Sequence, residues 1–170
     1  MSAHARRIVI TGFMCAGKTT VAGALARRLD ARMIDLDYII TERERRTASA
    51  LIDEEGEARF REAEQRALRV VLELGAARVI ALGGGAWMIP ENRALLAFHN
   101  CLTVWLDAPF ELCWQRITQS SEARPLARKL DEAHALYDAR LETYALAALR
   151  IEVTPEKDAD SLAREIAEAL

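Results

Sequence analysis

Residues 12–19 have the residue types and the spacing of a phosphate-binding loop, Gly-x-x-x-x-Gly-Lys-Thr. They follow an apolar run at residues 8–10 and precede a helix-forming run at residues 21–29. A loop between a strand and a helix can point several backbone N–H groups at one anion, and the helix dipole adds about half a positive charge there. A chance match in a glycine-tolerant turn is the competing interpretation. Because the context fits on both sides, the sequence predicts an ATP or GTP site.

The individual positions of this loop suit distinct tasks in nucleotide binding. Gly12 and Gly17 permit the backbone angles and the close approach that a phosphate requires, and Lys18 can reach the terminal phosphates. The hydroxyl of Thr19 can coordinate the Mg²⁺ that bridges these phosphates. We therefore expect nucleotide contacts from Gly12, Cys15, Ala16, Gly17, Lys18, Thr19 and Thr20.

The bulk composition favours one globular domain over residues 1–170. Of the 170 residues, 51% are apolar and 29% are charged. A chain of this length can bury a hydrophobic core without disulfides or a structural metal. A formal net charge of -3 gives no reason to expect a nucleic-acid or membrane partner. The three cysteines form no CxxC pair, and no apolar stretch approaches the length of a membrane span. We expect a cytoplasmic monomer.

Apolar runs suited to buried parallel strands alternate with helix-length segments, which predicts an α/β sandwich. The expected strands are residues 7–11, 32–36, 78–82, 101–106 and 150–153. The expected helices are residues 18–29, 38–46, 57–74, 91–99, 109–119, 126–147 and 158–170, with a short turn at residues 49–53. On the helix over residues 57–74, the expected apolar stripe is Phe60, Ala63, Ala67, Val70, Val71 and Leu74.

Two aspartates follow the second expected strand. Asp35 and Asp37 are two residues apart, so their carboxylates lie on the same side of an extended chain. An open parallel sheet binds ligands beyond the carboxyl ends of its strands, where the phosphate loop also lies. One carboxylate can serve the metal through its water shell while the other orients or accepts the proton of an incoming hydroxyl. Helix capping by these acids is an equally open interpretation of the pair alone.

Three consecutive glycines, Gly83, Gly84 and Gly85, follow the third expected strand. Glycine loses much chain entropy on folding, so a run of glycines suggests that a ligand or another backbone comes very close. Their N–H groups can hold a carboxylate or a phosphate, and a flexible turn of small residues is the competing interpretation. Their position at the same sheet edge as the phosphate loop favours binding.

Three arginines are candidates for binding anions at this edge. Arg61 lies three residues before Glu64 on a helix, close enough to touch it. Arg124 lies in a polar loop over residues 118–126, and Arg140 lies on a late helix. Taken singly, each fits a solvated charge, but a forked guanidinium also suits a carboxylate or a transferring phosphoryl group.

Taken in order, these motifs resemble those of the shikimate kinase family over nearly the whole chain. The matching segments are residues 12–19, Asp35-x-Asp37, Gly56-Glu57-x-x-Phe60-Arg61-x-x-Glu64, Gly83-Gly84-Gly85, Arg124-Pro125-Leu126 and Arg140-x-x-x-Tyr144. The phosphate loop is shared by a vast superfamily, whereas the other motifs at this spacing are far more specific.

The resemblance implies the fold of the nucleoside-monophosphate kinases, a three-layer α/β sandwich with a five-stranded parallel sheet in the order 2-3-1-4-5. It also implies a substrate-binding region around residues 38–65 and a lid around residues 118–127. The implied reaction is the ATP-dependent phosphorylation of the shikimate 3-hydroxyl to shikimate 3-phosphate, in the pathway to chorismate and aromatic amino acids.

The resemblance also implies a role for each matching residue on the substrate side. Asp37 would hold the substrate hydroxyls and act as base or orienter. Arg61, Arg140 and the glycines at residues 83–85 would bind the substrate carboxylate, and Glu64 would hold Arg61 in place.

On the nucleotide side, the resemblance implies that Lys18 and Arg124 contact the phosphates during transfer. Arg116 would stack on adenine, and Pro155 falls near the adenine loop. The implied Mg²⁺ ligands are Thr19, directly, and Asp35, through water.

Four positions depart from the family's pattern. Thr41 replaces an acid, Arg45 replaces a turn glycine, and Ala48 and Ile52 occupy positions for apolar residues, with phenylalanine usual at position 52. These positions flank the substrate ring, so we expect a wider or reshaped pocket floor with consequences for substrate affinity or identity.

Two other functions remain open. One is a kinase of the same fold that acts on another hydroxylated acid or on a nucleotide, and the other is a non-catalytic nucleotide-binding relative. The clamp of Arg61, Arg140 and the three glycines favours a compact carboxylic acid over a nucleobase. The presence of Lys18, Asp37 and Arg124 argues against the non-catalytic relative.

Overall fold

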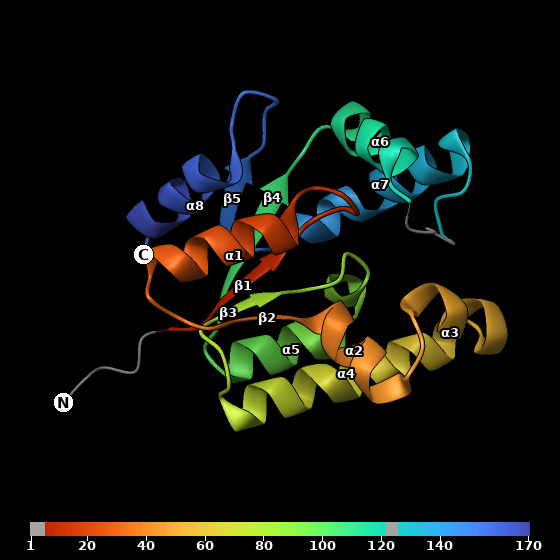
Figure 1. Cartoon of the computed structure of the whole chain (residues 1–170), viewed down its shortest axis with the longest axis horizontal. Coiled ribbons are helices and arrows are strands. Elements are labelled where there is room, and N and C mark those ends of the chain that lie inside the picture. Colours follow the sequence, from red (N-terminus) through yellow and green to blue (C-terminus); the bar gives the residue numbers. More distant parts are fainter. Residues whose placement is uncertain (1–5, 122–125) are drawn as a thin grey trace.

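The computed structural model describes residues 6–121 and 126–170. At its centre is a five-stranded sheet in the order β2-β3-β1-β4-β5, and every neighbouring pair of strands is parallel (Figure 1). The strands are β1 (Ile8–Thr11), β2 (Met33–Asp35), β3 (Val79–Ala81), β4 (Leu102–Asp107) and β5 (Leu149–Glu152). The predicted α/β fold and strand order are confirmed.

Helices cover both faces of the sheet. They are α1 (Lys18–Arg28), α2 (Leu36–Glu44), α3 (Ala48–Glu55), α4 (Glu57–Leu74), α5 (Pro90–Phe98), α6 (Phe110–Gln119), α7 (Leu130–Tyr144) and α8 (Ala159–Glu168), with the short 3₁₀ helix η1 (Ala86–Met88). Helices α1 and α8 pack together on one face, while α4 and α5 lie on the other (Figure 1). This burial on both sides explains why β1 is apolar along its length up to Thr11 and is buried throughout.

Helix α4 has the predicted bounds, but its predicted apolar stripe is wrong in part. Leu68 and Leu72 are fully buried, whereas Leu74 is 73% exposed and Val70 is only half-buried. The core-facing side of a helix recurs at every third or fourth residue, so the stripe continues through positions 68 and 72. At Leu74 the helix ends and the side chain points to solvent.

Several predicted boundaries are wrong by a few residues. Strand β2 ends at Asp35 rather than at Leu36, because the Asp35 side chain caps α2 by accepting from the N–H groups of Asp37 and Tyr38. The helix predicted from residue 126 begins at Leu130 and ends at Tyr144. The other strand and helix ends shift by no more than about two residues, which is the usual disagreement in placing element boundaries.

The predicted short turn at residues 49–53 is a complete helix, α3 (Ala48–Glu55). The hydroxyl of Thr47 caps it by accepting from the N–H of Ala50 at 3.1 Å. Only Leu51 of this helix is buried. A segment with a single core residue has little apolar periodicity, which explains why the sequence pattern indicated only a turn.

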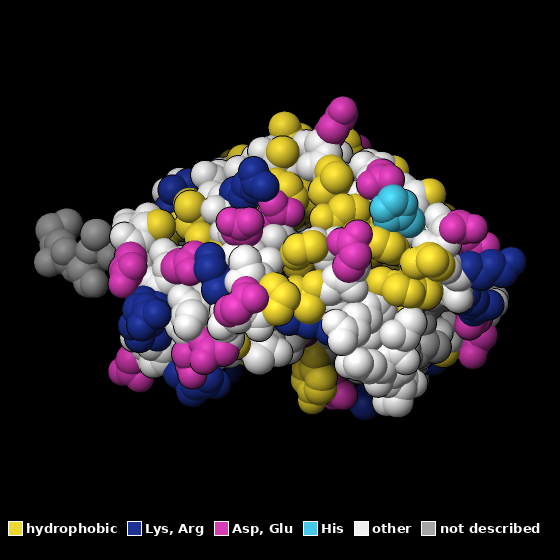
Figure 2. All heavy atoms as spheres, turned by 90° about the horizontal axis from the view of Figure 1, so that it is seen from above, with side chains coloured by type: hydrophobic (Ala, Val, Ile, Leu, Met, Phe, Trp, Pro, Cys, Tyr) yellow, Lys and Arg dark blue, Asp and Glu magenta, His cyan; other side chains and the backbone are white. Residues whose placement is uncertain are grey.

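The surface carries charges of both signs. On the face shown in Figure 2, Lys and Arg side chains are interspersed with Asp and Glu. This mixture agrees with the small formal net charge of -3. Within residues 6–121 and 126–170, every helix is too short or too polar to cross a bilayer.

Candidate active site

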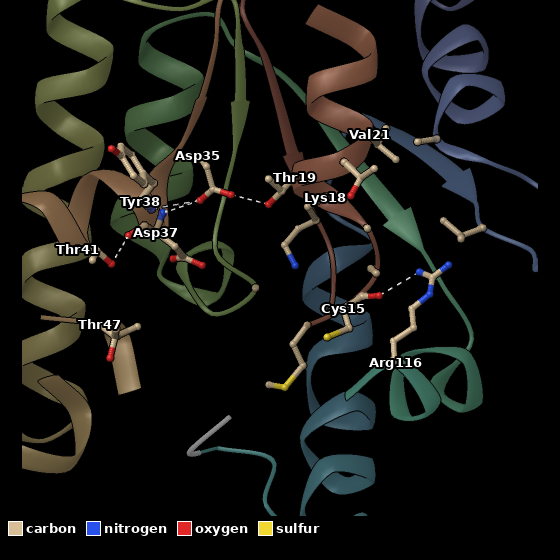
Figure 3. A pocket seen from close by; sticks show the side chains of 18 of the residues that line it. Cys15, Lys18, Thr19, Val21, Asp35, Asp37, Tyr38, Thr41, Thr47 and Arg116 are labelled. Atoms are coloured by element: carbon tan, nitrogen blue, oxygen red, sulfur yellow. Dashed lines mark hydrogen bonds between the residues drawn. The ribbon is translucent and has the colours of Figure 1, made fainter. Parts of the chain in front are cut away.

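A cavity of about 1320 Å³ opens at the carboxyl edge of the sheet. The phosphate loop and the start of α1 form one wall, and the β2–α2 junction faces them (Figure 3). The first turns of α3 and α8 complete the cavity. Segments far apart in the sequence therefore meet where a parallel sheet places its ligands.

The phosphate loop has the backbone conformation that its glycines predict. Gly12 and Gly17 have φ angles of 146° and 100°, and a Cβ on Gly12 would lie 2.7 Å from the carbonyl oxygen of Leu106 in β4. Gly17 caps α1 without a side-chain hydrogen bond, and the first turn of the helix lines the cavity, where its N–H groups can bind an anion.

Lys18 lies over this loop. Its Nζ donates to the carbonyl oxygens of Gly12 at 2.9 Å and Phe13 at 2.8 Å. These contacts hold the ammonium group at the cavity wall, and Figure 3 shows the side chain pointing into the space that Asp37 also faces. The charge is therefore placed beside the N–H groups of the loop, where a phosphate would bind.

Thr19 and Asp35 each place an oxygen atom at the cavity where it can coordinate a metal ion. The Thr19 hydroxyl donates to Asp35 Oδ2 at 2.5 Å, while Asp35 Oδ1 accepts from the backbone of α2 (Figure 3). Asp35 therefore caps a helix and also faces the metal candidate Thr19, so its two predicted roles are compatible. A hydroxyl and a carboxylate beside a phosphate loop match the preference of Mg²⁺ for oxygen ligands, so these residues fit the ion.

A second cavity of about 110 Å³ adjoins the first and is suited to an acid. Arg61 and Arg140 line it from α4 and α7, together with the glycine segment of residues 83–85. Phe60 and Ile52 contribute apolar surface. Two guanidinium groups and a run of backbone N–H groups around apolar walls can hold a small carboxylate ring.

Arg61 is held firmly on its helix. Its guanidinium group donates to Glu64 at 2.8 Å and to Glu57 at 3.1 Å, and it lies 5.1 Å from the centre of the Phe60 ring. A Cβ on Gly85 would overlap with this guanidinium group, so only glycine leaves room for it. Burial lowers the pKa of Arg61, but Glu64 and Glu57 outweigh burial and raise it.

Glu64 is a buried acid beneath this clamp, with 1% exposure. Burial raises its pKa to about 7, against the lowering effect of Arg61 and with a further raising effect from Asp37. Its Oε1 accepts from Arg61, whereas within the described residues Oε2 has no hydrogen-bond partner. Glu64 therefore both orients Arg61 and changes its charge near neutral pH.

The two cavities share a wall. Both are lined by Asp37 and Gly84, together with Met14, Ala48 and Ser49. A Cβ on Gly83 would lie 3.0 Å from Asp37 Oδ1 and 3.0 Å from Glu64 Oε2, so both acids approach the glycine segment. A carboxylate thus lies at the junction between a phosphate pocket and an acid pocket, which is the position needed to handle the proton of a hydroxyl that attacks a phosphate.

Comparison with known proteins agrees with this geometry. The family model for shikimate kinase matches residues 14–170. The chain belongs to the shikimate kinase family. Curated shikimate kinases from Geobacter sulfurreducens and Ruegeria pomeroyi are 42% and 34% identical to it, over 95% and 97% of this chain and 89% and 85% of theirs.

Solved structures of the shikimate kinase family have the same fold. The Acinetobacter baumannii shikimate kinase in complex with shikimate aligns with a TM-score of 0.88 at 31% identity, covering 98% of this chain and 93% of that chain. The Bacteroides thetaiotaomicron shikimate kinase aligns with a TM-score of 0.83 at 32% identity, covering 96% and 97%.

Most of the predicted site residues lie on the two cavities. The larger cavity is lined by Cys15, Ala16, Gly17, Lys18, Thr19, Thr20, Asp35, Asp37, Gly84 and Arg116, and the smaller by Asp37, Arg61, Gly83, Gly84, Gly85 and Arg140. Arg116 reaches the phosphate loop from α6 and donates to the Cys15 carbonyl at 3.0 Å (Figure 3). The structure therefore brings together residues separated by more than 100 positions.

Two predicted residues, Gly12 and Pro155, are absent from these linings, and a third, Arg124, lies outside the described residues. Gly12 is absent from both and instead makes room for β4 and accepts from Lys18. Pro155 is also absent from both, and Val153 and Lys157 line the larger cavity in its place. Arg124 and Pro125, the centre of the expected lid, lie outside the described residues.

The sequence reasoning missed parts of the larger cavity. The missed lining residues include Met14, Tyr38, Thr47, Ala50, Asp53, Lys157, Asp158, Ala159 and Leu162. Asp158 caps α8 by accepting from the N–H of Ser161 at 2.8 Å. A capping acid shortly after the last strand was the available signal for this wall, because it places a helix start at the same sheet edge.

The four departures from the family pattern have identifiable positions. Thr41 donates to the backbone carbonyl of Asp37 at 3.0 Å. Arg45 ends α2 with φ 56°, a left-handed conformation that glycine adopts more readily. Ala48 and Ile52 line the acid cavity, as expected for residues that shape its floor.

Proposed function

We propose that this chain catalyses the ATP-dependent phosphorylation of shikimate at its 3-hydroxyl, giving shikimate 3-phosphate. Membership of the shikimate kinase family supports this reaction. The similar Acinetobacter baumannii enzyme was solved in complex with shikimate, which supports the acid as the acceptor substrate. The observation that carries the proposal is Asp37, which lies on the shared wall of the phosphate cavity and the acid cavity.

In this mechanism Asp37 accepts a hydrogen bond from the 3-hydroxyl of shikimate. This bond directs the hydroxyl oxygen at the γ-phosphorus of ATP. The new P–O bond forms as the bond between the γ-phosphorus and the β,γ-bridging oxygen breaks, and ADP leaves with that oxygen. The hydroxyl proton passes to Asp37 as the bond forms. Such a transfer needs positioning and charge stabilisation more than covalent chemistry, so no side-chain nucleophile is required.

The acceptor acid is oriented by its carboxylate. Arg61 and Arg140 supply guanidinium donors, and the glycine segment at residues 83–85 supplies backbone N–H groups. Glu64 orients Arg61 from beneath. Because both arginines are largely buried, with Arg140 only 7% exposed, their contacts act in a low-dielectric site where charge pairing is strong.

The nucleotide is held by the phosphate loop and Lys18, with Arg116 and the start of α8 lining the remainder of the larger cavity. Thr19 and Asp35 would hold Mg²⁺. When bound, this ion neutralises charge on the phosphates during transfer. Arg124 lies outside the described residues, and we propose that it contacts the phosphates during transfer.

We also propose that the chain acts as a cytoplasmic monomer. The residues that the proposed mechanism uses on the two cavities, including Lys18, Asp37 and Arg61, all belong to this chain, so the mechanism requires no residue of a second copy. The proposed phosphoryl donor, ATP, is a cytoplasmic metabolite.

The proposed function is tested by a coupled ADP-release assay with shikimate, quinate, gluconate and nucleoside monophosphates side by side. We expect rapid turnover with shikimate alone, and phosphorus-31 NMR of the product should place the phosphate on the 3-hydroxyl. Faster turnover with another acid or a nucleotide would reassign the acceptor. Nucleotide binding without turnover on any acceptor would support the non-catalytic alternative.

A further inference from the structure

Tyr144 is a buried polar residue beside the acid cavity, at the end of α7. It is 1% exposed, and it is not among the described residues that line either cavity. Its ring stacks on Trp105 of β4, with the ring centres 6.0 Å apart and the planes inclined by 16°. The stack fixes the ring, so the hydroxyl has a defined position.

That hydroxyl donates to the carbonyl oxygen of Gly84 at 2.9 Å, over a separation of 60 residues. Burial raises the pKa of Tyr144 to about 12, against the lowering effect of the nearby Arg140 charge. The hydroxyl therefore keeps its proton and remains a donor at neutral pH. Arg140, one helical turn earlier on the same face, approaches the same glycine segment beside this hydroxyl.

The surroundings of Gly84 show how tightly this link is packed. A Cβ on Gly84 would lie 3.0 Å from the carbonyl oxygen of Gly12, 3.2 Å from the Tyr144 hydroxyl and 3.6 Å from Arg140 Nη1. The phosphate loop, the glycine segment and α7 therefore meet at one point, where a side chain on Gly84 would crowd the tyrosine hydroxyl.

A second bond ties the same two segments together in the opposite direction. Trp87 Nε1, in η1 directly after the glycine segment, donates to the carbonyl oxygen of Thr143 at 2.7 Å. The Trp87 bond has its donor in η1, next to the glycine segment, and the Tyr144 bond has its donor on α7. The pair fixes both the distance and the rotation between α7 and the glycine segment.

Peptide geometry connects this bond to the substrate. The carbonyl of Gly84 and the N–H of Gly85 belong to one rigid planar peptide unit and point in opposite directions. A hydrogen bond from Tyr144 to the carbonyl therefore also sets the direction of the Gly85 N–H, and Gly85 lines the acid cavity.

We propose that Tyr144 is a positioning residue for the acceptor acid: its hydroxyl sets the Gly85 N–H and braces Arg140, so that both converge on the substrate carboxylate. This inference rests on the proposed function. The tyrosine does not touch the substrate and acts only through these two groups.

The test compares Tyr144→Phe with Tyr137→Phe. Tyr137 lies on the same helix, and its hydroxyl also donates to a backbone carbonyl, that of Ala108, at 2.9 Å. Tyr137 is not among the described lining residues, so its variant controls for the loss of a tyrosine hydrogen bond. Steady-state kinetics are measured for shikimate and for ATP, with thermal unfolding in parallel.

We expect Tyr144→Phe to raise the KM for shikimate by about tenfold, as loss of a group worth one hydrogen bond predicts. Its kcat and its KM for ATP should stay within about twofold of the parent values, and Tyr137→Phe should leave the KM for shikimate unchanged. Installing 4-aminophenylalanine at position 144, which restores an N–H donor, should recover most of the lost affinity.

An unchanged KM for shikimate in Tyr144→Phe, or equal kinetic changes in both variants, would overturn the positioning role. So would a failure of 4-aminophenylalanine to restore affinity. Should Tyr144→Phe be unstable, parent and variants are compared at a lower temperature at which circular dichroism shows them all folded. Absence of shikimate turnover in the parent would contradict the proposed function instead, so the two failures are distinguishable.

Discussion

At the scale of single residues, Asp37 has the decisive position. It follows the end of β2, lies in the first turn of α2 and lines both cavities. The nucleotide side and the acid side could each bind a ligand without it, but the proposed reaction passes the hydroxyl proton to Asp37 on their shared wall.

Asp37→Asn therefore tests the reaction chemistry. The amide keeps the size of the side chain but cannot accept the proton, so we expect kcat to fall about a hundredfold or more, the lower range for loss of a general base. ATP affinity, measured by titration calorimetry, should stay near the parent value. Turnover above about a tenth of the parent rate would contradict the role of base or orienter.

Glu64 makes a second residue-scale prediction, for stability against pH. Its pKa is about 7 in the folded chain, against an ordinary value of 4.5. Between these values the folded state holds a proton that the unfolded state has released, so this group lowers the free energy of unfolding as pH rises from 4.5 to 7. Above that window the loss is complete, at about 3 kcal/mol.

Glu64→Gln removes this titration. The free energy of unfolding, measured in urea at pH 4.5 and pH 8 for both proteins, should shift in favour of the variant by about 3 kcal/mol over this range. Parallel pH profiles for the parent and Glu64→Gln would show that the carboxyl group of Glu64 titrates alike in the folded and unfolded states.

At the scale of elements, α3 forms part of the wall of the larger cavity and has a single fully buried residue. Its single buried residue is Leu51, and ion pairs join it to neighbouring segments, including Arg128 with Asp53 at 2.8 Å. Exposed pairs of this kind contribute little, because solvent screens them. The Thr47 cap adds a directional contact that holds the first turn, which contributes Ala48, Ser49 and Ala50 to the larger cavity.

Thr47→Ala should weaken α3 by about 1 kcal/mol, the usual value of an N-cap. Hydrogen exchange followed by NMR should then be about fivefold faster at the amides of the first turn, the factor to which this energy corresponds, while protection of the strands stays unchanged. Thr47→Ser, which keeps the capping oxygen, is the matched control. Equal exchange in the two variants would show that the cap does not hold this turn.

At the scale of the whole molecule, one edge of the sheet carries two cavities whose linings suit different ligands. The phosphate loop and Lys18 face the larger cavity, whereas Arg61 and Arg140 face the smaller. Among the described residues, the two cavities share a wall that contains Asp37 and Gly84. This arrangement allows affinity for the nucleotide and affinity for the acid to be changed separately.

We therefore expect Arg61→Ala to raise the KM for shikimate by about thirtyfold or more, the effect of removing one partner from a buried charge pair, with a much smaller change for ATP. Lys18→Ala should show the reverse preference. Arg69→Ala removes an exposed charge from the same helix as Arg61 and should change neither constant. Equal losses for both substrates in Arg61→Ala would contradict the separate acid clamp.

The sequence by itself determined the phosphate loop, the strand order implied by the family resemblance, and a set of site residues most of which lie on the two cavities. The loop, the strands and the site residues are readable because they depend on local rules: glycines where φ is positive, apolar runs where strands are buried on both faces, and polar residues directly after strand ends. The strand order came from the family resemblance. The tertiary structure alone decided that Asp37 and Gly84 form a shared wall, that α3 is a helix, that α8 closes the nucleotide side and that Tyr144 reaches Gly84. Those relations join segments up to more than 100 residues apart, and the packing of the helices on the sheet sets their distances, which no local pattern encodes.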